Sequence, residues 1–173
     1  MTLSPPLLSL RASELFPDPR DGDLLAAARA HPAIFLDAYA IIYDPPTSRE
    51  LRFHLWDWQW ELLSHFLKLK RVVILKARQL GVSWLLAGYA LWKALFFPNT
   101  YVLLISKKES VAADLLAKAA YIYHRLPASL RPATRKKDKD NTTELSWDAI
   151  NSGIYAEAST KSSGRSKSAT LVI

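Results

Sequence analysis

The segment "LKARQLGVSW" (residues 75–84) holds residue types that bind the phosphates of a nucleotide. A common phosphate-binding loop reads G-x-x-x-x-G-K-[ST]. Aligned to that pattern, Gly81 is the second glycine, Ser83 is the hydroxyl residue, and Val82 stands where lysine is usual. Gly81 can form the turn, Ser83 can bind Mg²⁺, and the following helix can offer its first N–H groups to phosphate. Lys76, at the place of the first glycine, and Arg78 are the candidate phosphate-binding cations.

Taken alone, this segment is also compatible with an ordinary strand–turn–helix connection that carries incidental basic residues. In that interpretation Ser83 is the N-cap of its helix, which does not exclude a role in binding Mg²⁺. The elements around the loop are therefore needed to judge it.

The residues that flank the loop predict alternating strands and helices. "RVVIL" (71–75) and "TYVLLIS" (100–106) are apolar runs typical of strands buried on both faces, and a long apolar helix is predicted over 83–97. Ser106 and Glu109 have the spacing of a capping box that opens another helix, which Pro127 ends. The core face of that helix is predicted to hold Val111, Leu115, Ala119, Ile122 and Leu126.

The C-terminal third predicts a hairpin and a last strand. "ELSWDAI" and "IYAEAS" flank Asn151-Ser152-Gly153, a turn signal, and "ATLVI" is predicted to be a third buried strand after the polar loop "TKSSGRSKS". This alternation predicts an α/β fold with a parallel sheet flanked by helices and carrying a hairpin.

The N-terminal residues predict an irregular arm followed by short elements. Asp23 is expected to cap a short helix over "LLAAARA", and Pro32 limits that helix before a second one begins. A Pro-Pro turn and an extended piece follow. Apolar residues between Trp58 and Lys68 recur at helical spacing, which predicts an amphipathic helix there.

Composition and charge narrow the function classes. The 173 residues include no cysteine, which excludes disulfide frameworks and cysteine-based zinc sites, and the four histidines lack ligand-like spacing. Residues 1–60 carry 5 basic and 8 acidic residues, whereas residues 61–173 carry 18 and 8. The basic part therefore fits an anionic partner such as nucleic acid or a nucleotide, or simply forms a solvated basic face. The apolar run 82–97 is short for a bilayer span and contains Lys93, so we expect no membrane association and an intracellular, soluble chain.

Four segments in order resemble the large subunit of phage terminases, the ATPases that pump viral DNA into procapsids. "KARQLGVSW" is similar to the family's deviant phosphate-binding loop, in which some members carry the lysine at the front. "LRFHLWDWQWELL" resembles its adenine-recognition segment, with Gln59 as the base-reading residue. "YVLLISKKESVAADLLAKA" is similar to the strand and helix that follow, and "STKSSGRSKSATLVI" to the Gly-Arg loop before the magnesium-binding strand. The resemblance covers roughly residues 30–173.

The resemblance implies a fold, a cofactor set and partners. It implies a P-loop NTPase-type sheet, with lead-in segments over 1–57 and a partial ATPase domain over 58–173. ATP and Mg²⁺ would be bound by Gln59, Lys76, Ala77, Arg78, Gln79, Leu80, Gly81, Val82 and Ser83, with Ser83 on the metal and Arg78 and Arg165 as candidate catalytic residues. The implied partners are double-stranded DNA, the portal protein, the small terminase subunit and further copies in a ring. The implied location is the cytoplasm of the bacterial host, and transiently the procapsid portal.

The sequence also departs from the family. The usual lysine is replaced by Val82, and the acidic magnesium-binding pair, the coupling motif and the nuclease domain would follow Ile173, so we expect a truncated chain that binds ATP but hydrolyses it poorly. Gln59 is alternatively a solvent-facing helix residue, and Trp58 and Trp60 are better explained as core packing than as adenine stacking. Arg165 is equally well an exposed loop residue, and "RKKDKD" a solvated loop. A helicase-like ATPase, a basic nucleic-acid-binding domain and an inert prophage remnant are the alternative functions.

Overall fold

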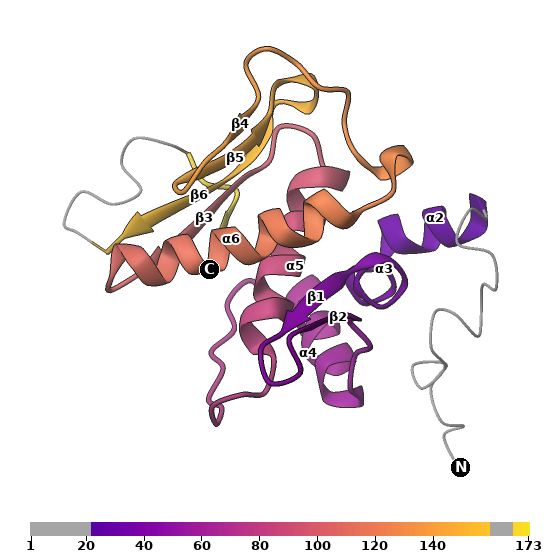
Figure 1. Cartoon of the computed structure of the whole chain (residues 1–173), viewed down its shortest axis with the longest axis vertical. Coiled ribbons are helices and arrows are strands. Elements are labelled where there is room, and N and C mark those ends of the chain that lie inside the picture. The colour runs from indigo at the N-terminus through magenta and orange to yellow at the C-terminus, as the bar shows by residue number, and fades with distance from the viewer. Residues whose placement is uncertain (1–21, 160–167) are drawn as a thin grey trace. The chain divides into compact units, whose positions relative to one another are not determined.

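A computed structural model describes residues 22–159 and 168–173 (Figure 1). The chain divides into two compact units, Met1–Leu80 and Gly81–Ile173. The division falls inside the candidate phosphate-binding loop, between Leu80 and Gly81, while the division into residues 1–57 and 58–173 by role stays a prediction.

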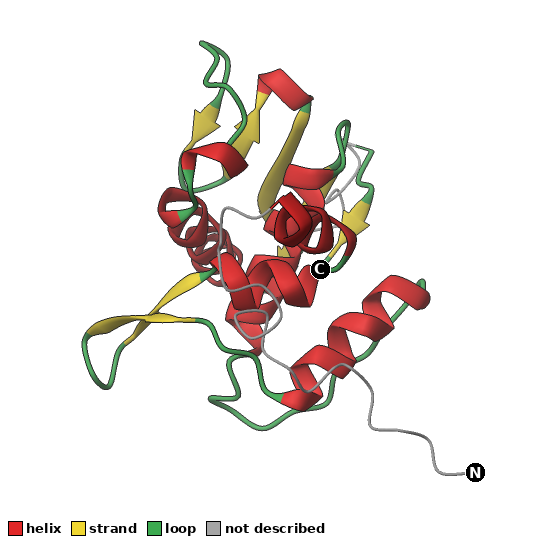
Figure 2. Ribbon diagram, turned by 90° about the vertical axis from the view of Figure 1, so that its right-hand side faces the viewer, coloured by secondary structure: helices red, strands yellow, loops and turns green. Residues whose placement is uncertain are grey.

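The described part of the first unit, residues 22–80, contains three helices and a hairpin. Its described elements are α2 (Gly22–Ala30), α3 (Pro32–Tyr39), β1 (Ile41–Asp44), β2 (Arg49–Arg52) and α4 (Asp57–Lys68). β1 and β2 pair antiparallel across the predicted Pro-Pro turn and form a separate twisted ribbon (Figure 2). Asp23 lies in the first turn of α2 instead of capping it, because the helix already includes Gly22.

The predicted amphipathic helix is confirmed as α4. Trp60 and Leu63 are buried on one side, and the exposed Glu61 and Lys68 lie on the other. α4 contacts α3, whose buried residues include Phe35 and Leu36. The core of this unit is therefore formed by apolar faces of short helices.

The described residues of the second unit form two long helices and a five-stranded sheet. Its elements are α5 (Val82–Phe96), β3 (Tyr101–Ser106), α6 (Glu109–Arg125), β4 (Lys139–Asp140), β5 (Glu144–Trp147), β6 (Ser152–Ala158) and β7 (Leu171–Val172), with short 3₁₀ helices at Ala128–Leu130 and Asp148–Ile150. The strand order is β4-β5-β6-β3-β7. β3 is parallel to both β6 and β7, whereas β4, β5 and β6 pair antiparallel. The predicted α/β class, parallel centre and hairpin are thus present, in a sheet that is mixed as a whole.

The sheet of this unit is covered by α5 and α6. These helices contact one another, and each contacts β3 and β6. The fully buried side chains at this junction include Trp92 of α5, Leu116 of α6, Leu104 of β3 and Ile154 of β6. The apolar helix predicted over 83–97 and the strand predicted over 100–106 are confirmed within one residue at each end.

The strand predicted at "RVVIL" is wrong. Residues 71–77 have no helix or strand assignment, and the side chains of Val73 and Leu75 are 96% and 101% exposed. A short apolar run makes a buried strand only if neighbouring strands accept its backbone hydrogen bonds on the sheet. The described residues of this run have no such ladder partner.

Two predictions about α6 also differ from the structure. The helix α6 has Lys108 as its N-cap, with no side-chain cap, because Ser106 is the last residue of β3 and its carbonyl accepts a hydrogen bond from the Ser159 N–H. Part of the predicted core face of α6 is shifted by one residue. Ala112 and Leu116 are buried, whereas the predicted Val111 is 51% exposed.

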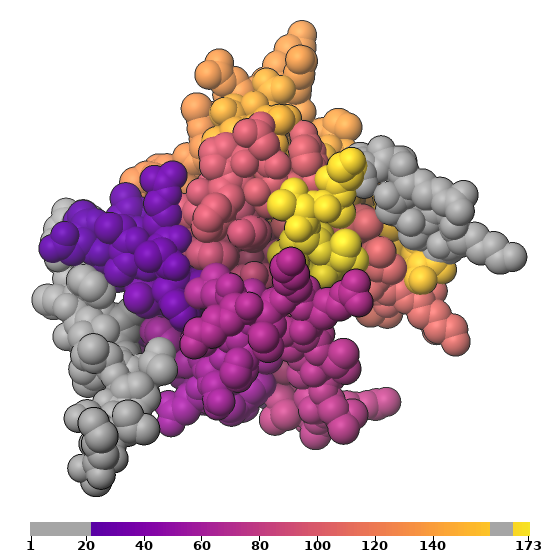
Figure 3. Space-filling model, turned by 180° about the vertical axis from the view of Figure 1, so that it is seen from behind, coloured from indigo at the N-terminus to yellow at the C-terminus, as the bar shows by residue number. Residues whose placement is uncertain are grey.

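The last strand exists but is not buried. β7 pairs with β3, and the ladder continues to Ile173, whose N–H donates to the Leu103 carbonyl. Val172 is 57% exposed, and the end of the chain lies at the surface in the space-filling view (Figure 3). β7 is thus an edge strand among the described strands.

Candidate nucleotide-binding loop

The candidate loop has an unusual backbone. Arg78 and Gln79 form a turn, and both Gln79 (φ 64°) and Gly81 (φ 69°) lie in the left-handed region. Glycine adopts this conformation freely, whereas a residue with a side chain does so uncommonly. The sequence therefore places its one loop glycine at the residue where the turn passes into α5.

The loop leads into an uncapped helix end. Gly81 is the N-cap of α5 and provides no side chain, and the first backbone hydrogen bond of the helix runs from the Leu85 N–H to the Gly81 carbonyl, at 3.0 Å. The N–H groups of Val82, Ser83 and Trp84 thus have no acceptor within the helix. Ser83 is exposed in the first turn and is not the N-cap. This end of a 15-residue helix is suited to an anion.

The side chains of the loop divide into exposed cations and a buried valine. Lys76, Arg78 and Gln79 are exposed, as is Ala77. Among the described residues neither Lys76 nor Arg78 has a hydrogen-bond or ion-pair partner. Val82 is only 4% exposed and belongs to the core of the second unit. The position that carries lysine in the usual pattern is therefore an apolar packing position here.

Gln59 is buried, so its interpretation as a solvent-facing residue is wrong. It is 2% exposed, and both ends of its amide have backbone partners. Its Oε1 accepts a hydrogen bond from the Trp56 N–H at 3.0 Å, which caps α4, and its Nε2 donates to the Leu80 carbonyl at 3.3 Å. A side chain on α4 is thus bonded to the candidate loop.

The aromatic residues near Gln59 differ in burial. The Trp60 ring is buried and stacks on His31, with ring centroids 6.0 Å apart. Trp58 is half-buried and contacts Trp56, whose side chain is 54% exposed. The expectation that Trp60 is a packing residue is confirmed.

A serine and a histidine that sequence reasoning did not single out lie together in the first unit. His31 Nδ1 accepts a hydrogen bond from the Ala33 N–H, so the neutral ring carries its proton on Nε2, which lies 3.4 Å from Ser64 Oγ. Burial also lowers the pKa of His31. The imidazole therefore donates to the serine and cannot take its proton, so this pair is not an activated nucleophile.

Asp37 is a second residue that the sequence did not reveal. It lies within α3, is 2% exposed, and its Oδ1 accepts from the Leu55 N–H and lies 3.4 Å from His54 Nδ1. A single acid in an apolar helix gives no sequence signal for such contacts. The two contacts of Asp37 hold the segment that precedes α4.

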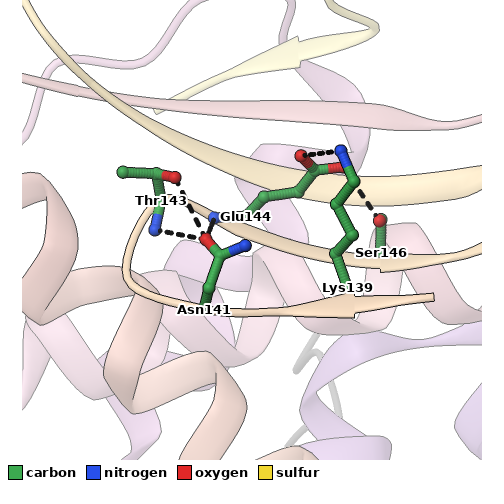
Figure 4. A network of polar contacts seen from close by, with 5 residues as sticks. All are labelled: Lys139, Asn141, Thr143, Glu144 and Ser146. Carbon is green, nitrogen blue, oxygen red and sulfur yellow. Dashed lines mark hydrogen bonds and ion pairs between the residues drawn. The ribbon is translucent and has the colours of Figure 1, made fainter. Parts of the chain in front are cut away.

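The basic loop before β5 is partly neutralised. Lys139 Nζ lies 3.0 Å from Glu144 Oε2, and Ser146 Oγ donates to the other oxygen of Glu144 at 2.9 Å (Figure 4). Asn141 Oδ1 accepts the Thr143 and Glu144 N–H groups, which fixes the turn between β4 and β5.

Beside this network lies a polar pocket of about 460 Å³. Its wall includes Tyr155, whose pKa is raised to about 12 by burial and by Glu144. Three lysines and three carboxylates line the pocket, so its formal charge balances; they are Lys136, Lys137, Lys139, Asp138, Glu144 and Asp148.

Arg165, the candidate catalytic arginine of "TKSSGRSKS", lies outside the described residues. Across 22–159 and 168–173, no helix combines the length and apolar character needed to cross a membrane.

No family model matches this sequence, and no curated protein matches it.

Proposed function

We propose that this chain is the ATP-binding part of a viral DNA-packaging motor of the terminase large-subunit type. One observation carries the proposal: a left-handed glycine opens an uncapped 15-residue helix, with unpartnered cations before it and an exposed serine after it. Strong phosphate sites combine these elements. The order of the four resembling segments supports the choice of this motor over other nucleotide-binding proteins.

The residues present fit Mg²⁺·ATP, and each has a distinct proposed role. The free N–H groups at the start of α5 would bind phosphate oxygens, and Lys76 or Arg78 would neutralise their charge. The Ser83 hydroxyl is the proposed metal ligand, and the metal would supply charge neutralisation at the phosphates. Arg165 remains the second proposed catalytic residue.

In the complete motor, hydrolysis by in-line attack of water would be coupled to movement of double-stranded DNA into a procapsid. Portal protein, small terminase subunit and further copies in a ring are the proposed partners. Lys136 and Lys137 are exposed, and neither has a partner among the described residues, so they are the proposed phosphate contacts on DNA.

The proposal predicts saturable, magnesium-dependent ATP binding with little turnover. In a titration with a fluorescent ATP analogue, EDTA should weaken binding, and Ser83→Ala should lose most of this metal dependence. We expect phosphate release by the 173-residue chain to stay near background.

The matched control is Ser110→Ala, an exposed serine in the first turn of α6 that should leave binding unchanged. Rapid, Lys76-dependent phosphate release would contradict the prediction of little turnover.

A basic nucleic-acid-binding domain without nucleotide chemistry is the second candidate. The exposed Lys136 and Lys137 favour it. DNA binding that weakens steeply with salt, with no ATP binding under any condition, would select this function instead.

A further inference from the structure

Both ends of the Gln59 side-chain amide are bonded to the protein backbone. Its Oε1 accepts from the Trp56 N–H, its Nε2 donates to the Leu80 carbonyl, and the residue is 2% exposed. A base-reading amide must present its oxygen and nitrogen together to the edge of the base, which requires access to a ligand. Each end of the amide keeps one more hydrogen-bonding position, but at 2% exposure Gln59 would have to leave its buried site to reach a base, which would disturb its backbone bonds at a cost.

The bond to Leu80 acts at the centre of the candidate loop. Leu80 lies between the two left-handed residues, Gln79 and Gly81, and the bond joins residues 21 positions apart in sequence. The chain has no cis peptide among its described residues, so the Leu80 carbonyl and the Gly81 N–H point in opposite directions across one planar peptide. A carbonyl held toward Gln59 therefore turns the Gly81 N–H away from Gln59.

We infer that Gln59 is a positioning residue that holds the phosphate-binding loop in its binding conformation, and that it does not select the base. This inference rests on the proposed function, because it assigns Gln59 a role in the same nucleotide site. Gln59 would orient the loop amides before any ligand arrives, which lowers the entropy lost on binding phosphate. Its effect should then be the same for every ligand that carries a triphosphate.

Two variants separate the contacts of Gln59. Gln59→Ala removes both hydrogen bonds. Gln59→Glu keeps an acceptor for the Trp56 N–H but replaces the donor that faces the Leu80 carbonyl with an oxygen. Ser64→Ala is the matched control, because it removes a polar group from the same helix, where Ser64 bonds the Trp60 carbonyl, and it does not contact the loop.

The experiment compares ATP, GTP and inorganic tripolyphosphate, each with Mg²⁺, by calorimetric titration of the four proteins. Both Gln59 substitutions should lower the affinity for all three ligands by a similar factor of about tenfold, the effect of one lost hydrogen bond. The ratio of the ATP affinity to the GTP affinity should stay constant. Ser64→Ala should bind all three as the wild type does. If the variants bound ATP more weakly but tripolyphosphate as tightly as the wild type does, Gln59 would read the base. If they bound all three ligands as the wild type does, Gln59 would neither read the base nor hold the loop. Each result would overturn the inference.

A second measurement separates this inference from the proposed function. Trypsin cleavage after Lys76 and Arg78, without nucleotide, should be several-fold faster in both Gln59 variants than in wild type or Ser64→Ala, because the loop loses its tether. If the wild type binds none of the three ligands, the proposed function fails, and the cleavage rates still decide whether Gln59 holds the loop. Equal cleavage rates in all four proteins would refute the tether.

Discussion

Val82→Lys, the substitution that completes the usual phosphate-loop pattern, is expected to lower the free energy of unfolding by about 3 kcal/mol without improving ATP binding. Val82 is 4% exposed at the first helical position of α5, in a unit whose core is apolar. A lysine there must either lose its hydration inside that core or displace the start of the helix. Both outcomes remove the buried apolar contacts of valine.

Urea unfolding of Val82→Lys beside Ala77→Lys tests this expectation. Ala77 is exposed in the same loop, so that variant adds the same charge at a position that requires no burial, and its stability should stay within about 0.5 kcal/mol of the wild type. The opposite result would be a Val82→Lys variant that is as stable as the wild type and binds ATP more tightly. The loop would then be a usual phosphate-binding loop that lacks only its lysine, and Lys76 would not replace that residue.

Gly81→Val is expected to abolish measurable nucleotide binding. Gly81 has φ 69°, and a β-branched residue in the left-handed region is a strong outlier, costing roughly 1–2 kcal/mol or more. The chain would relieve that strain by rotating the peptide that leads into α5. The N–H groups at the helix start would then no longer converge on one point.

Gly81→Asn is the matched variant, because asparagine also adds a side chain but tolerates the left-handed conformation. It should keep a large part of the binding that valine removes, within about tenfold of wild type. ATP titration of the three proteins, with circular dichroism to confirm the helix content, checks the pair. Equal loss in both variants would mean that the absence of a side chain, and not the backbone conformation, is what the site needs.

The sequence predicted the elements that depend on local signals. Helices α4 and α5, strand β3 and the β5–β6 hairpin follow from apolar periodicity, β-branched runs and the Asn151 turn, and all four are present. Asn151 adopts the left-handed conformation that such a turn requires. These signals lie within a few residues of the element they define.

Two of the failures depend on distant partners. "RVVIL" has the composition of a strand, but pairing with a neighbour decides strand formation, and Val73 and Leu75 are exposed. Ser106 has the spacing of a cap, but its pairing with Ala158 on β6 keeps it in the sheet. In the first turns of α6 the buried residues are Ala112 and Leu116, one position after the predicted Val111 and Leu115, whereas Ala119, Ile122 and Leu126 are buried as predicted.

The candidate site was predictable in its residues and not in its contacts. The loop glycine, the serine and the exposed cations follow from the pattern, but the burial of Val82 and the bond between Gln59 and Leu80 do not. That bond joins a helix to a loop 21 residues later, and no local spacing rule encodes it. The role proposed for Gln59 therefore depends on a contact that only the structure shows.

The most direct test of the central claim is a calorimetric titration of Mg²⁺·ATP into the wild-type chain and Lys76→Ala. The claim is that this loop binds phosphate with a lysine at its front in place of the usual one. It predicts saturable binding by the wild type and an affinity lower by about tenfold to a hundredfold in the variant, the range for a lost charged hydrogen bond. Equal affinity in the two proteins, or no binding by either, would contradict it.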